Sequence, residues 1–246
     1  FLKYIGGDLP WKYVLISTSL LSLLGGLVLF FMVEDGPYRG KAGDFKPSAL
    51  FTLFRDRNFR SAAFGYFGHM WELYTFWAFV PVMLAFHVKA TGASIDIPLW
   101  SFAIIGIGGI SCAIGGHFSL SLGSKKVAFI SLLISGLCCL FIPFLLKVST
   151  VMVLALMLIW GIFVVSDSPQ FSTLVAGSAD RSYVATGLTI VNSVGFAITI
   201  LSIQLVTYLW VSLETPWIFM LMLVGPVFGL ISLSKFNNRS SRNFSH

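Results

Sequence analysis

Seven long apolar runs constrain this chain more than any other feature. They cover residues 13–32, 61–88, 99–122, 127–146, 151–175, 185–210 and 217–233. A helix needs about 20 such residues to cross a bilayer, and only helices and closed barrels satisfy their backbone groups in lipid. No run shows the alternation of polar and apolar residues that barrel strands require. We therefore expect an all-α integral membrane fold with seven transmembrane helices.

The composition agrees with a membrane protein and excludes several partners. Hydrophobic residues make up 57% of the chain and charged residues 11%, whereas a soluble domain has about 25% charged residues. The net charge of +6 lies in the loops between the apolar runs, so it indicates a lipid bilayer and no nucleic acid. Cys112, Cys138 and Cys139 lie inside apolar runs without the spacing of metal ligands. We expect no metal and no cofactor.

The basic residues predict the orientation of the chain. Twelve of the 16 Lys and Arg residues fall on one side of the membrane in alternate loops, and four fall on the other: Lys3, Lys12, Lys89 and Lys147. Loops rich in Lys and Arg stay in the cytoplasm. We expect a multi-pass protein of the cell membrane, plasma or bacterial inner, with a cytoplasmic C-terminus.

Two acidic residues, Glu72 and Asp167, lie deep inside apolar runs. A carboxylate near the centre of the bilayer costs about a few kcal/mol on scales of helix insertion. Such a residue usually marks a substrate or proton pathway. The alternative is a side chain that only joins helices by hydrogen bonds. His69 precedes Glu72 by one helical turn, so we expect a hydrogen bond or a shared proton between them.

The surroundings of Asp167 indicate a break in its helix. Pro169 lacks the backbone donor that would bond to Val165, so a kink is expected there. Asp167 and Gln170 then either bind substrate or ions at the break or gate the cytoplasmic end. Asn192 belongs to a mildly polar face of the sixth run, which either contacts substrate or bonds to neighbouring helices.

Small residues four apart in the third run, Gly108, Cys112 and Gly116, predict a close helix contact. In the loop that follows this run, Gly116, Gly123 and Lys125 match a degenerate copy of the Gly-x-x-x-Asp-Arg-x-Gly-Arg-Lys loop of the major facilitator superfamily. Leu120 and Ser121 replace its acidic and first basic residues.

The order of segments also resembles that superfamily, from its sixth helix to its end. The resemblance implies the end of an N-terminal half at 1–32, a central cytoplasmic loop at 33–58, a six-helix C-terminal half at 59–235 and a cytoplasmic tail at 236–246. The run 50–54 in the loop forms either a short interfacial helix or a plain solvated segment. Because the chain begins at Phe1, we expect the other helices of the N-terminal half upstream.

The strings 68–74 and 166–172 look similar to a bacterial branch of the superfamily grouped with nitrate/nitrite and cyanate permeases. A nitrate site needs a buried cation, and none of the seven runs contains an interior Lys or Arg. The likeness therefore does not carry over to the substrate.

These features favour a secondary transporter of a small solute, working by alternating access and coupled to protons, and not an enzyme. A seven-span receptor is the first alternative, but the Asp-Arg-Tyr and Asn-Pro-x-x-Tyr strings are missing. An intramembrane enzyme is the second, but an aspartyl protease needs two membrane aspartates and only Asp167 is present.

Overall fold

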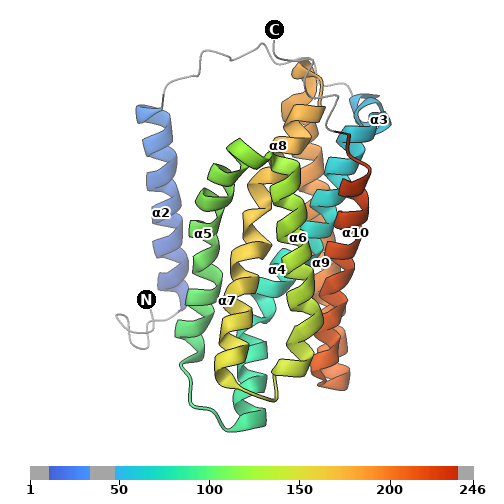
Figure 1. Cartoon of the computed structure of the whole chain (residues 1–246). Helices are drawn as coiled ribbons and strands as arrows, with labels where there is room; N and C mark the ends of the chain where they lie inside the picture. The colour runs from blue at the N-terminus through green and yellow to red at the C-terminus, as the bar shows by residue number, and fades with distance from the viewer. Residues whose placement is uncertain (1–10, 34–47, 238–246) are drawn as a thin grey trace. The chain divides into compact units, whose positions relative to one another are not determined.

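The computed structural model describes residues 11–33 and 48–237 of the chain (Figure 1). The chain divides into two compact units, residues 1–42 and 43–246, and each is described by itself. The described part of the first unit, residues 11–33, contains the helix α2 (Trp11–Met32), whose 22 residues include no charged side chain except Lys12. This length and composition suit a membrane span.

The second unit is helical throughout its described part. Its elements in chain order are α3 (Ser48–Arg55), α4 (Arg57–Thr91), α5 (Ile97–Leu122), α6 (Ser124–Leu145), α7 (Thr150–Ser166), α8 (Ser168–Ser178), the 3-10 helix η1 (Arg181–Tyr183), α9 (Val184–Leu213), the 3-10 helix η2 (Pro216–Leu223) and α10 (Val224–Ser234). Over the two described ranges seven helical segments are long and apolar enough to cross a membrane. The prediction of an all-α membrane fold with seven spans is confirmed.

Helix α4 lies against α8, α9 and α10, while α5 packs mainly on α7 (Figure 1). The contact between α4 and α10 is made by backbone, because a Cβ atom on Gly68 would collide with the carbonyl oxygen of Gly225. The contact between α5 and α7 also brings backbone close to backbone. Gly161 lies against the carbonyl oxygen of Ile104, so no larger residue fits there.

The predicted small-residue contact of α5 is correct for two of its three residues. Gly108 lies against Val165 of α7, and the Sγ atom of Cys112 donates to the carbonyl oxygen of Val165 at 3.5 Å. Gly116 has no neighbour within 4 Å at its Cβ position, and Gly115 packs on Ser166 instead. The repeat of 3.6 residues per turn moves the contact to Gly115 by the second turn.

One end of the bundle is tied by polar contacts to the end of α10. Asn58 and Asn237 form two hydrogen bonds. Nδ2 of Asn58 donates to the carbonyl oxygen of Asn237 at 3.0 Å, and the backbone N–H of Asn237 donates to Oδ1 of Asn58 at 2.9 Å. Nζ of Lys125 donates to the carbonyl oxygen of Phe236 at 2.6 Å. Of the two alternatives for residues 50–54, the short helix is present, as α3.

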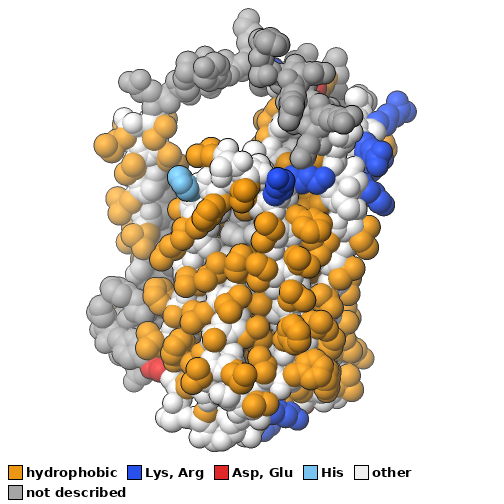
Figure 2. All heavy atoms as spheres, viewed as in Figure 1, with side chains coloured by type: hydrophobic (Ala, Val, Ile, Leu, Met, Phe, Trp, Pro, Cys, Tyr) orange, Lys and Arg blue, Asp and Glu red, His pale blue; other side chains and the backbone are white. Residues whose placement is uncertain are grey.

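The other end is tied through His87, which is fully buried near the end of α4. Its Nδ1 lies 2.9 Å from the carbonyl oxygen of Leu146, and its Nε2 lies 2.9 Å from Oγ1 of Thr150. These contacts fix α4 to the connection between α6 and α7. Figure 2 shows hydrophobic side chains over the middle of the visible face, with Lys and Arg side chains near its ends, as a bilayer requires.

Candidate functional site

Glu72 lies on α4 and is fully buried in the six-helix bundle. Its carboxylate accepts three hydrogen bonds from two other helices. Oε1 accepts from Nε1 of Trp160 at 2.7 Å and from Sγ of Cys139 at 3.2 Å. Oε2 accepts from Oγ of Ser135 at 3.0 Å. Each contact is a donor, so the arrangement matches an ionised carboxylate, which only accepts.

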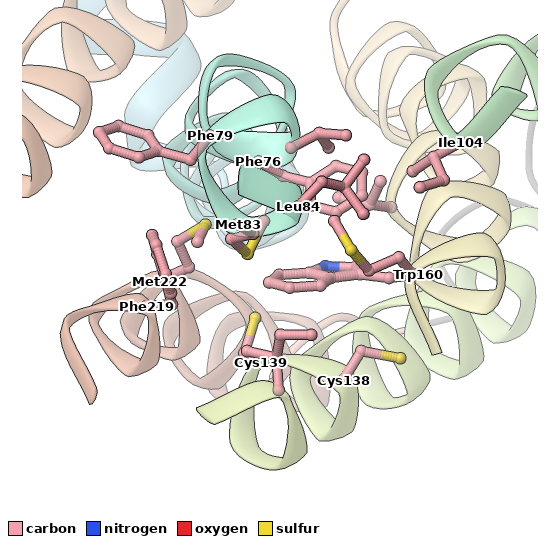
Figure 3. Close-up of a cluster of buried hydrophobic side chains, with 14 of the residues drawn as sticks. Phe76, Phe79, Met83, Leu84, Ile104, Cys138, Cys139, Trp160, Phe219 and Met222 are labelled. Carbon is pink, nitrogen blue, oxygen red and sulfur yellow. The ribbon is translucent and has the colours of Figure 1, made fainter. Parts of the chain in front are cut away.

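Trp160 is held in place by packing as well as by this bond. Its ring lies 4.5 Å from that of Phe76, centroid to centroid, and Figure 3 shows it among Phe76, Met83 and Cys139. Aromatic residues of spans are common at the membrane interfaces, but Trp160 is fully buried. The buried indole can satisfy its N–H only through a partner such as Glu72.

His69 contacts Asp167 and not Glu72. Nδ1 of His69 lies 2.9 Å from Oδ1 of Asp167, and both residues are fully buried. The distance is that of an ion pair, and neither side chain has a regular hydrogen bond in the described part of the chain. The rings of Tyr66 and Phe171 flank His69, each with its centroid 5.8 Å away.

The expected bond between His69 and Glu72 is therefore absent, although one turn separates them. Residues three apart on a helix are offset by about 60° around its axis, since each residue turns about 100°. On α4 this offset directs Glu72 toward α6 and α7 and directs His69 toward Phe171 of α8. The two side chains therefore contact different helices.

The predicted break at Pro169 is present. Helix α7 ends at Ser166 and α8 begins at Ser168, with Asp167 between them. The break is anchored to α6, because Oγ of Ser166 lies 2.7 Å from Oγ of Ser131. Gln170 is buried on the first turn of α8.

Glu72, His69 and Asp167 are fully buried side chains of one bundle, and we call these three residues the buried cluster. Between residues 51 and 237 no Lys or Arg side chain is buried, so within this cluster only His69 can carry a positive charge. No set of three or more His, Cys, Asp and Glu side chains in the described ranges suits a metal ion.

Asn192 lies apart from this cluster. It is exposed on α9, on a face that also presents Thr189, Ser193 and Gln204. The opposite face of α9 is bonded into the bundle, where Oγ1 of Thr75 donates to Oγ of Ser202 at 2.8 Å. The structure thus pairs His69 with Asp167, gives Glu72 separate partners on α6 and α7, and leaves Asn192 on the outside of the unit.

The residues matched to the loop motif have separate roles. Gly123 makes the turn between α5 and α6 with φ of 83°, a region that favours glycine. Lys125 ties α6 to the end of α10, whereas Gly116 contacts nothing that would require a glycine.

The sequence profile described as the Major Facilitator Superfamily matches residues 1–203. The chain belongs to the major facilitator superfamily. No curated protein and no solved structure matches it. Membership confirms the resemblance to the superfamily, and the protein is a secondary transporter with a lipid bilayer around it and a small-molecule substrate. Members of the superfamily are transporters and not enzymes.

Proposed function

We propose that this major facilitator moves a small solute by alternating access and couples that movement to protons through Glu72. The supporting observation is a charge count. Two fully buried carboxylates, Glu72 and Asp167, lie in one bundle, and of the two only Asp167 has a histidine, His69, at ion-pair distance in the described part of the chain. A buried charge without a partner is strongly unfavourable. A proton bound by the cluster supplies the missing positive charge.

Asp167 is proposed to act at the break between α7 and α8. Its position between two helical segments links the charge of the cluster to the angle between them, and Gln170 sits on the same turn of α8. Discontinuous helices of this kind carry the sites of many transporters. A change in the charge of Asp167 or of its partner His69 would alter the short contact between them and so bias the position of α8.

Asn192 is proposed to contact the substrate. In the superfamily a second six-helix half faces the first across the pathway, so an exposed polar face on a span suits that position. The exposed face of α9 offers amide and hydroxyl groups without a charged side chain. This chemistry fits a polar solute, and it supplies no cation for a nitrate-like anion.

The test is Glu72→Gln in the transporter reconstituted in liposomes, with Asp167→Asn as the matched variant. Glutamine keeps the size of the side chain and most of its hydrogen bonds but does not titrate. We expect Glu72→Gln to abolish accumulation driven by a pH gradient and to leave exchange of labelled for unlabelled solute partly intact. Asp167→Asn should instead change the rates of both. Normal accumulation by Glu72→Gln would show that Glu72 only joins helices.

The cytoplasmic position of the C-terminus and of the basic loops is also proposed, from the distribution of Lys and Arg. A cysteine introduced at the exposed Ser121 should react with an impermeant thiol reagent only from the cytoplasmic side, and one at the exposed Ser94 only from outside. The background for both lacks the three native cysteines. Labelling in the opposite sense would reverse the orientation.

A further inference from the structure

Ser135 of α6 has one hydroxyl hydrogen and two acceptors within reach. Its Oγ lies 3.0 Å from Oε2 of Glu72 and 3.2 Å from the carbonyl oxygen of Leu132. Ser135 is fully buried, so no water competes for the hydrogen. The hydroxyl can turn from one acceptor to the other by rotation about a single bond, because hydroxyl hydrogens rotate to suit their surroundings.

The two oxygens of Glu72 are not equivalent. Oε1 accepts from both Trp160 and Cys139, while Oε2 accepts only from Ser135. A proton added to Oε1 would face two donors, whereas a proton added to Oε2 faces an oxygen with free lone pairs. The arrangement therefore directs a proton to Oε2.

We propose that Ser135 is a positioning residue that lets Glu72 gain and lose a proton at Oε2 without movement of α4 or α6; this rests on the proposed proton coupling. When Glu72 is ionised, the Ser135 hydroxyl donates to Oε2. When a proton arrives, it binds to Oε2 of Glu72, and the resulting O–H group donates to Oγ of Ser135. The serine hydrogen then turns to the carbonyl oxygen of Leu132, so each state keeps its hydrogen bonds.

Few other titratable groups act on Glu72. Helix α6 contributes Cys138 and Cys139, and the break after α7 contributes Asp167. Helix α4 also carries His69 and Tyr74, and α5, which packs on α4, carries Cys112 and His117. The segments η2, α8 and α10 contain no titratable side chain, and Tyr208 of α9 is exposed. Asp167 has no hydroxyl placed as Ser135 is, since its carboxylate oxygens lack hydrogen-bond partners in the described part of the chain.

The test compares Ser135→Ala with Ser135→Thr, which keeps a hydroxyl, and with the control Ser131→Ala one turn away on α6. Ser131 is equally buried but bonds to Ser166. If the added methyl of threonine prevents folding, Ser135→Cys, with its weak donor, replaces it. The first readout is infrared absorption of the protonated carboxyl, assigned to Glu72 by its loss in Glu72→Gln.

In Ser135→Ala the carboxyl band should move to higher wavenumber, because the O–H group of Glu72 has lost its acceptor. In Ser135→Thr and Ser131→Ala the band should stay in place. Proton-driven accumulation should fall about 10-fold in Ser135→Ala, the effect of one hydrogen bond to a charged group. If the band and the accumulation are both unchanged in Ser135→Ala, the proposed role of Ser135 is overturned. Absence of the band from the wild-type protein would overturn it as well. Normal accumulation in Glu72→Gln would overturn proton coupling itself, so the two failures are distinguishable.

Discussion

Glu72 and Asp167 are equally buried carboxylates in one bundle, yet their surroundings differ in kind. Glu72 lies on an unbroken helix and accepts bonds from three donors on two neighbouring helices. Asp167 lies between two helices, and its carboxylate is at ion-pair distance from His69. The comparison teaches that depth in the membrane does not define the role of an acid. The surroundings of Glu72 suit a proton site in a fixed frame, and those of Asp167 suit an ion pair at a joint.

The largest expected effect comes from breaking the pair at the joint. In His69→Ala, Asp167 loses the imidazole that lies 2.9 Å from its carboxylate, and removal of one partner of a buried pair typically costs about 3–5 kcal/mol. We expect a loss of that size in the free energy of unfolding, measured by denaturant titration in micelles. The double variant with Asp167→Asn should recover much of it, because the unpaired charge is gone. Additive losses would show that the pair is not coupled.

A smaller effect is expected when Glu72 loses one of its donors. Trp160→Phe keeps an aromatic ring against Phe76 but removes the N–H, and hydrogen bonds to charged groups contribute about 1.5–3 kcal/mol. Trp71→Phe is the control, because Nε1 of Trp71 donates to a neutral acceptor, the carbonyl oxygen of Leu221, at 3.0 Å. Its loss should be about 0.5–1.5 kcal/mol. Equal losses by denaturant titration would show that Glu72 is neutral in the folded protein.

The smallest effect on stability is expected outside both regions. Asn192→Ala on the exposed face of α9 should change the free energy of unfolding by less than about 0.5 kcal/mol. The apparent KM for solute should rise about 2- to 10-fold, the effect of one neutral hydrogen bond. Ile200→Ala, an exposed apolar position on the same helix, is the control. An unchanged KM in Asn192→Ala would remove Asn192 from the pathway.

The helical spans and the break at Pro169 could be predicted from sequence because both depend on local chemistry. Apolar length sets a span, and a proline removes a specific donor. The partners of Glu72 could not be predicted, since they depend on how α6 and α7 are rotated against α4. One signal was present: Ser131, Ser135 and Cys139 recur every four residues on α6 and share one face. Nothing in the sequence showed which acid that face would meet.

The pairing of His69 with Asp167 shows the same limit. Closeness along α4 suggested Glu72 as the partner of His69, but the offset around the helix axis and the position of α8 decided otherwise. Gly116 is a similar case, because a repeat of four drifts away from the contact face and Gly115 takes its place. Spacing identified the helix faces, and only the packed structure identified the pairs.

Helix α4, which carries both Glu72 and His69, is much longer than the membrane is thick. Its 35 residues rise about 52 Å at 1.5 Å per residue, against a hydrocarbon layer of about 30 Å. A span of this length tilts, extends beyond the lipid or thickens it locally. Lipids with shorter or longer chains therefore act on the tilt of the helix that holds Glu72, which makes bilayer thickness a mechanical input to the proposed proton site.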